Sequence, residues 1–255
     1  IQMYANVVLG VEHARFEAVI ANKKRMDNVE SDADFNVDQL NWIINAYKNT
    51  VERFTDAAFP QEPYEQLIGA IEAVFNSWQN KRAVTYRKIN NIPDAWGTGA
   101  TVQTMVFGNL NDKSGTGVAF TRNPSNGDKE LYGEYLINAQ GEDVVAGIRT
   151  PHPIKKNKKV EQESLESKFP KAYKEILEIS TKLENHFKEV QDIEFTIENE
   201  DIYLLQTRKA KRTAQASVKI AIDMQNEGVV TKEEAITMVD ANSITNLLHT
   251  QFVDS

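Results

Sequence analysis

The spacing of hydrophobic residues changes once along the chain, from a helical period to an alternating one. From residue 3 to about residue 77, apolar residues recur every three or four positions, as on one face of an α-helix. Three helices are predicted there. The third, at 64–78, should turn an apolar face inward, made of Leu67, Ile68, Ile71, Val74, Phe75 and Trp78. From about residue 100 the period is two, which is typical of β-strands.

The alternating segments are separated by turn sequences, which predicts an antiparallel sheet. Strands are expected at 101–107, 118–121 and 130–138, with a glycine-containing turn at 111–117 and a loop at 138–143. A long amphipathic helix is expected at 169–190. Antiparallel strands joined by short turns, with helices before and after them, favour an α+β fold over a doubly wound parallel sheet.

The last two alternating segments, 191–197 and 202–208, are expected to form a β-hairpin around the polar residues 198–201. If the turn centres on Glu200, residues whose numbers sum to 400 lie opposite each other. Asp192 then faces Arg208. Glu194 faces Gln206 on the same side of the sheet. The other side should be a core face, on which Ile193, Phe195 and Ile197 meet Thr207, Leu205 and Tyr203.

Two carboxylates, an amide and a guanidinium on one strand face suit a divalent cation next to a phosphate. Mg²⁺ takes oxygen ligands and usually keeps waters and phosphate oxygens in its shell, and the planar fork of an arginine binds phosphate. The alternative is an exposed strand face with a cross-strand ion pair between Asp192 and Arg208. The pattern alone leaves both open.

Composition excludes several classes of protein. A net charge of -8 argues against a nucleic acid or an anionic membrane as the main partner. The absence of cysteine excludes disulfides and thiolate metal sites. No run of about 18 apolar residues is present to span a membrane. The chain begins with Ile1 and has no signal-peptide pattern, so we expect it to be an interior part of a longer protein.

Other candidates for ligand binding are weaker. The turn expected at 114–117 could approach a phosphate through backbone N–H groups, although glycine-containing hairpin turns are common. Gln103 and Met105 could flank a purine, or could belong to a half-exposed strand. Glu134 and Glu142 could bind a metal or a ribose, or could be surface carboxylates. Neither a Walker A pattern nor a dinucleotide-binding glycine fingerprint is present.

Several long runs of sequence resemble the pyruvate phosphate dikinase family. They are WGTGATVQTMVFGN at 96–109, SGTGVAFTRNP at 114–124 and YGEYLINAQGEDVVAG at 132–147, with shorter matches at 59–63, 191–195 and 205–208. Looser relatives, such as phosphoenolpyruvate synthase, share the Ser-Gly and Asp-x-Glu patterns but not the full runs. The resemblance covers nearly the whole chain and implies an ATP-grasp nucleotide-binding region.

The resemblance implies a reaction and a role for individual residues. ATP phosphorylates a histidine on a separate swivelling domain, which passes the phosphoryl group to pyruvate at a barrel-shaped domain. The parent protein is expected to be a cytoplasmic homo-oligomer. The implied roles are Mg²⁺ binding by Asp192 and Glu194, phosphate contact by Gln206, Arg208, Gly115 and Gly117, adenine contact by Gln103, Met105 and Val106, and metal or ribose contact by Glu134 and Glu142.

The resemblance also implies a domain organisation. We expect a helical subdomain at 1–65, the larger part of a nucleotide-binding region at 66–211, and linker helices at 212–255 that lead toward the phosphohistidine domain. The family's lysine and its arginine-containing phosphate loop are expected before Ile1, so this chain should hold about half of an ATP site and perform no turnover alone. The Lys- and Glu-rich stretch 154–169 is interpreted as a surface insertion. The rival hypothesis is a structural or interaction module with a vestigial ATP site.

Overall fold

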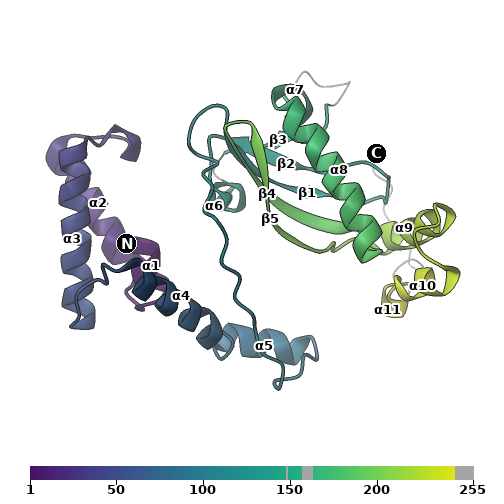
Figure 1. The fold of residues 1–255 in the computed structure, drawn as a ribbon, viewed down its shortest axis with the longest axis horizontal. Coiled ribbons are helices and arrows are strands. Elements are labelled where there is room, and N and C mark those ends of the chain that lie inside the picture. Colours follow the sequence, from purple (N-terminus) through teal and green to yellow (C-terminus); the bar gives the residue numbers. More distant parts are fainter. Residues whose placement is uncertain (148, 157–162, 245–255) are drawn as a thin grey trace. The chain divides into compact units, whose positions relative to one another are not determined.

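The computed structural model describes residues 1–147, 149–156 and 163–244 (Figure 1). The chain forms two compact units, Ile1–Gln103 and Thr104–Ser255. The boundary between them lies further along the chain than residue 65, where the helical subdomain was expected to end. Within the described residues, no helix has both the length and the apolar character needed to cross a membrane.

The first unit is helical. Its elements are α1 (Gln2–Val7), α2 (His13–Asp27), the 3-10 helix η1 (Asp32–Asp34), α3 (Val37–Thr55), α4 (Pro63–Ser77) and α5 (Lys81–Ile89). A capping box starts α3, because the Asn36 side chain accepts a hydrogen bond from the Gln39 backbone and the Gln39 side chain accepts one from the Asn36 backbone. The core lies between α2 and α3, where the rings of Phe16 and Tyr47 meet edge to face with centroids 5.0 Å apart.

The prediction that the third helix packs an apolar face inward is wrong within this unit. No residue of α4 is buried, and Ile68, Val74 and Phe75 are exposed. The neighbouring helix α1 is only six residues long and covers a small part of α4. Hydrophobic periodicity predicts that a helix has an apolar face, but it does not say that the same compact unit covers that face.

The second unit is built on a five-stranded antiparallel sheet in the order β3-β2-β1-β4-β5 (Figure 1). The strands are β1 (Gly115–Phe120), β2 (Tyr132–Ile137), β3 (His152–Pro153), β4 (Gln191–Glu198) and β5 (Asp201–Lys209). The helices are α6 (Gly141–Ala146), α7 (Leu165–Lys168), α8 (Pro170–Phe187), α9 (Ala214–Asn226), α10 (Lys232–Thr237) and α11 (Ala241–Ile244). Helix α8 covers one face of the sheet, where Tyr135, Ile176 and Phe195 belong to one core cluster. The predicted α+β class is confirmed.

Three local predictions in this unit are wrong. Residues 97–107 form neither helix nor strand, although a strand was expected at 101–107. An extended segment shows the same alternation of side chains as a strand, even when it pairs with no neighbour. The expected turn at 111–117 ends early, since β1 already begins at Gly115, and the expected loop at 138–143 gives way to α6 at Gly141.

Candidate functional site

The hairpin of β4 and β5 has the predicted register where the candidate site lies. Asp192 pairs with Arg208, and Glu194 pairs with Gln206. Beyond Glu194 the predicted register is wrong by one residue, because a β-bulge lies between Glu194 and Phe195 in the pairing. Phe195 and Ile197 therefore lie opposite Leu204 and Ile202, and not opposite Leu205 and Tyr203. The core face itself is confirmed, since Ile193, Phe195 and Ile197 are all buried.

The shift has its origin in the turn. Asn199 and Glu200 both have positive φ angles, of 51° and 73°, so the strands are joined by a two-residue turn. A turn centred on Glu200 alone would have kept the sum of 400 along the whole hairpin. The bulge absorbs the difference of one residue, which restores the predicted pairs at the base of the hairpin.

The face of the hairpin that carries Asp192, Glu194, Gln206 and Arg208 is called the acidic face. It contains the cross-strand ion pair that was one of the two hypotheses for this surface. Arg208 Nε donates to Asp192 Oδ2 at 2.7 Å, and a second guanidinium nitrogen lies 3.7 Å from Glu194 Oε1. The hydrogen bond with Asp192, and the charge of that carboxylate, raise the pKa of Arg208. The Asp192 side chain is 11% exposed and that of Arg208 is 58% exposed, so the guanidinium can also reach an anion in solvent.

One row of paired residues crosses four strands on the acidic face. Glu134 of β2 pairs with Val118 of β1, Val118 pairs with Glu194, and Glu194 pairs with Gln206. Directly paired residues share a face of the sheet, so Glu134 lies on the side of Glu194 at a distance of two strand spacings, roughly 10 Å. The side chain of Glu142 lies outside the described part of the chain. Within that part, no group of three or more His, Cys, Asp or Glu side chains is placed to hold a metal ion.

The two glycines that were expected near phosphates lie on the opposite face. Gly115 and Gly117 belong to β1 and alternate with Thr116 and Val118, which face the acidic side. A Cβ atom on Gly117 would lie 2.7 Å from the Phe195 ring and 2.8 Å from the Tyr135 Cβ. On the described structure, Gly117 therefore allows close packing of the sheet under α8.

The residues expected at an adenine are divided between the two units. Gln103 ends the first unit, and Met105 and Val106 belong to the second. The segment that carries Met105 and Val106 is hydrogen-bonded to the second unit at the next two residues, Phe107 and Gly108. The Phe107 backbone N–H donates to Glu198 Oε2 at 2.5 Å, and the Gly108 carbonyl accepts from the Ala139 backbone N–H at 2.9 Å.

A buried arginine, Arg122, was not among the residues predicted from the sequence. Arg122 follows β1, its side chain is 0% exposed, and its guanidinium binds Glu184 of α8 at 2.9 Å and Glu227 at the end of α9 at 2.8 Å. Hydrogen bonds from Arg122 hold the pKa of Glu227 below its usual value. The sequence did carry a signal, because Glu184 continues the buried stripe of α8 after Ile176 and Ser180 at intervals of four residues. A carboxylate on a core-facing stripe needs a cationic partner.

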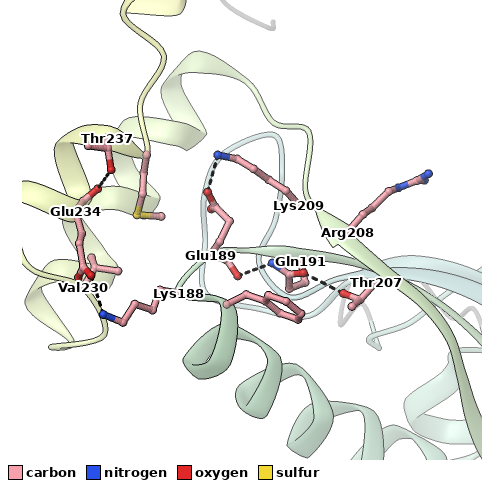
Figure 2. Close-up of a pocket in the computed structure, with 11 residues that line it drawn as sticks. Lys188, Glu189, Gln191, Thr207, Arg208, Lys209, Val230, Glu234 and Thr237 are labelled. Atoms are coloured by element: carbon pink, nitrogen blue, oxygen red, sulfur yellow. Dashed lines mark hydrogen bonds and ion pairs between the residues drawn. The ribbon is translucent and has the colours of Figure 1, made fainter. Parts of the chain in front are cut away.

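A cleft of about 490 Å³ lies at the base of the hairpin, beside α10 (Figure 2). Of the predicted site residues, only Arg208 lines it. Glu189 in this cleft binds Lys209 at 2.8 Å and also binds Arg212. Burial favours the neutral carboxyl, but the hydrogen bonds from Arg212 and Lys209 outweigh it and hold the pKa of Glu189 below its usual value. Arg208 points away from this network (Figure 2), so the cleft is a neighbour of the acidic face and not part of it.

Comparison with known proteins places the chain in a family. Residues 48–172 and 154–229 match the family model described as "Pyruvate phosphate dikinase, AMP/ATP-binding domain". A pyruvate, phosphate dikinase of Rhizobium meliloti (strain 1021) is 51% identical over 253 residues, which are 98% of this chain and 28% of the relative. One of Clostridium symbiosum is 51% identical over 253 residues, which are 99% of this chain and 28% of the relative.

A plant relative gives the same result. The chloroplastic pyruvate, phosphate dikinase 1 of Arabidopsis thaliana is 46% identical over 254 residues, which are 100% of this chain and 26% of that protein. The chain thus spans little more than a quarter of the length of these relatives. The antiparallel sheet with flanking helices is consistent with the ATP-grasp-like fold expected for such a domain. The chain belongs to the family of the pyruvate phosphate dikinase AMP/ATP-binding domain.

Proposed function

We propose that this chain is the part of a pyruvate phosphate dikinase that binds MgATP. The observation that carries the proposal is the acidic face of the hairpin, where Asp192, Glu194, Gln206 and Arg208 lie on paired strands. The family match supports a nucleotide as the ligand. The names of the relatives support the reaction.

The donor atoms on this face fit Mg²⁺ with an incomplete protein shell. Asp192 and Glu194 offer carboxylate oxygens, and Gln206 offers an amide oxygen from the neighbouring strand. Mg²⁺ is normally bound by one or two carboxylates together with waters and substrate phosphates, so a cluster of three acidic residues is not required. Bound Mg²⁺ would supply positive charge at the phosphates. Arg208 would add its own charge close to the transferred phosphoryl group.

The other proposed contacts concern the rest of the nucleotide. Gln103, Met105 and Val106 would line the base. Glu134, exposed on the acidic face, would reach a metal ion or the ribose. In the parent reaction, ATP, pyruvate and phosphate give AMP, phosphoenolpyruvate and pyrophosphate. A phosphohistidine domain of the same parent chain would carry the phosphoryl group to pyruvate at a third domain, and the parent would be a homo-oligomer.

Calorimetric titration of MgATP tests the proposal. The unaltered chain should bind MgATP, and the variant with both Asp192→Asn and Glu194→Gln should lose that binding. A control with Glu52→Gln and Glu178→Gln removes the same charge from exposed positions on α3 and α8 and should bind normally. Equal binding by all three proteins would refute the assignment of the acidic face. We also expect that the chain alone forms no phosphoenolpyruvate from ATP, pyruvate and phosphate.

A further inference from the structure

Glu198 makes a contact that the proposed function does not use. It is the last residue of β4. The pairing of β4 with β1 runs without a register shift from Asp192 to Ile197, so side chains alternate regularly along β4 and Glu198 lies on the same face of the strand as Asp192 and Glu194. Its carboxylate accepts the hydrogen bond from the backbone N–H of Phe107, 91 residues earlier in the chain. A hydrogen bond to an ionised acceptor is roughly twice as strong as one between neutral groups.

The segment just before Phe107 is suited to hold a flat heterocycle. Met105 is 71% exposed, and its thioether can pack against an aromatic ring. Among the described residues, no hydrogen bond joins the peptide groups of Met105 or Val106 to the rest of the protein. Two consecutive peptide groups therefore present both donors and acceptors to a ligand, which is what the edge of a purine requires.

Such an edge recognises a base only if it is held at a fixed place. Two contacts do this on the downstream side of the segment, namely the Glu198 carboxylate on Phe107 and the close approach of Gly108 to the sheet. A Cβ atom on Gly108 would lie 2.4 Å from the Ala139 carbonyl oxygen, so the backbone at Gly108 packs closely against that of Ala139. Without the carboxylate, the Phe107 backbone N–H would lose its hydrogen-bond partner, and the backbone at 105–107 would be held less firmly on its downstream side.

We propose that Glu198 is a positioning residue, which sets the base-binding segment 105–107 at a fixed distance from the phosphate end of the site. This inference rests on the proposed function. Glu198 is four residues from Glu194, so roughly 13 Å of one strand separates the carboxylate that anchors the base segment from the carboxylate proposed for the metal. One rigid strand thereby fixes the distance between the base-binding segment and the proposed metal site. This spacing favours the binding of a nucleoside triphosphate over that of a bare triphosphate.

The test compares two ligands on one set of variants by calorimetry, magnesium ATP and magnesium tripolyphosphate. Glu198→Ala should weaken ATP binding about tenfold, as expected for the loss of a hydrogen bond to a charged group, and should leave tripolyphosphate binding unchanged. Glu198→Gln keeps an oxygen acceptor and should recover most of the ATP affinity. Glu200→Ala removes the same charge from an exposed position two residues further along and should change neither ligand.

The outcomes separate this inference from the proposed function. If the unaltered chain binds neither ligand, both are refuted. If it binds ATP, and Glu198→Ala weakens both ligands equally or neither, the positioning role alone is refuted. Amide hydrogen exchange gives a readout without ligand. The Phe107 N–H should exchange faster in Glu198→Ala than in Glu198→Gln, and equal rates would remove the structural basis of the inference.

Discussion

Replacement of Arg122 by methionine should destabilise the second unit and leave the first unit intact. The guanidinium is fully buried and binds both Glu184 and Glu227, which come from helices on two different parts of the unit. Methionine fills a similar volume but cannot bind either carboxylate. Glu184, whose side chain is 11% exposed, would then remain in the interior without its cation.

The magnitude follows from the burial of the group. Removing one partner of a buried ion pair typically costs about 3–5 kcal/mol, because the other charge stays buried and uncompensated. For a unit of this size, each kcal/mol lowers the melting temperature by about 2–4 °C, so a decrease of about 10 °C is expected. Lys129→Met is the matched control. Lys129 also binds Glu227, at 2.9 Å, but it is 63% exposed, and its loss should cost less than about 1 kcal/mol.

Tryptophan fluorescence can show which of the two units loses stability. All three tryptophans, Trp42, Trp78 and Trp96, lie in the first unit. In urea unfolding, Arg122→Met should move the part of the far-UV circular dichroism transition that comes from the second unit toward lower urea, and should leave the tryptophan fluorescence transition in place. An unchanged circular dichroism transition would refute the reasoning. A triple variant that also carries Glu184→Met and Glu227→Met should recover much of the loss, since no unpaired charge stays buried.

Two further predictions concern packing and pH. Gly117→Ala should destabilise the second unit by about 2 kcal/mol in thermal unfolding, because the new methyl group would be forced against the Phe195 ring. Gly141→Ala is the control. A Cβ atom on Gly141 would have no neighbouring atom within 4 Å, so this substitution should change the stability little. The pKa of Glu189 is lowered in the folded chain, so its contribution to stability is complete above its usual pKa of 4.5 and is lost as the pH falls through the folded value. Unfolding free energies measured from pH 7 to pH 3 should therefore fall less steeply below pH 4.5 in Glu189→Gln than in the unaltered chain.

The sequence predicted the hairpin well because its information was local. Strict alternation fixed which face was buried, and the polar residues between the strands fixed the approximate register, so Asp192 was correctly placed opposite Arg208. The bulge after Glu194 was not predictable from alternation, since it depends on the backbone angles of a two-residue turn without glycine. The error reached only the tip of the hairpin because the bulge lies on the far side of Glu194.

Predictions failed where the pattern needed information about a distant partner. Residues 101–107 alternate like a strand, but alternation does not show whether a neighbouring strand is available. The apolar face of α4 likewise gave no indication of what covers it. Arg122 was missed for the same reason. Its partners lie 62 and 105 residues away, and only the fold brings the three charges together.

The ion pair between Arg208 and Asp192 leads to a last prediction, because a guanidinium and a divalent cation compete for the same carboxylates. Arg208→Met should strengthen the binding of Mg²⁺ alone, since Asp192 and Glu194 lose a competing cation. The Arg208 side chain is 58% exposed, so the competing pair is worth less than about 1 kcal/mol and the gain should be at most about fivefold. The same variant should weaken MgATP, because the phosphates lose a cationic partner. Titration with each ligand measures both effects. Opposite changes are expected, and a parallel loss of Mg²⁺ and MgATP binding would mean that Arg208 orders the carboxylates and does not compete for them.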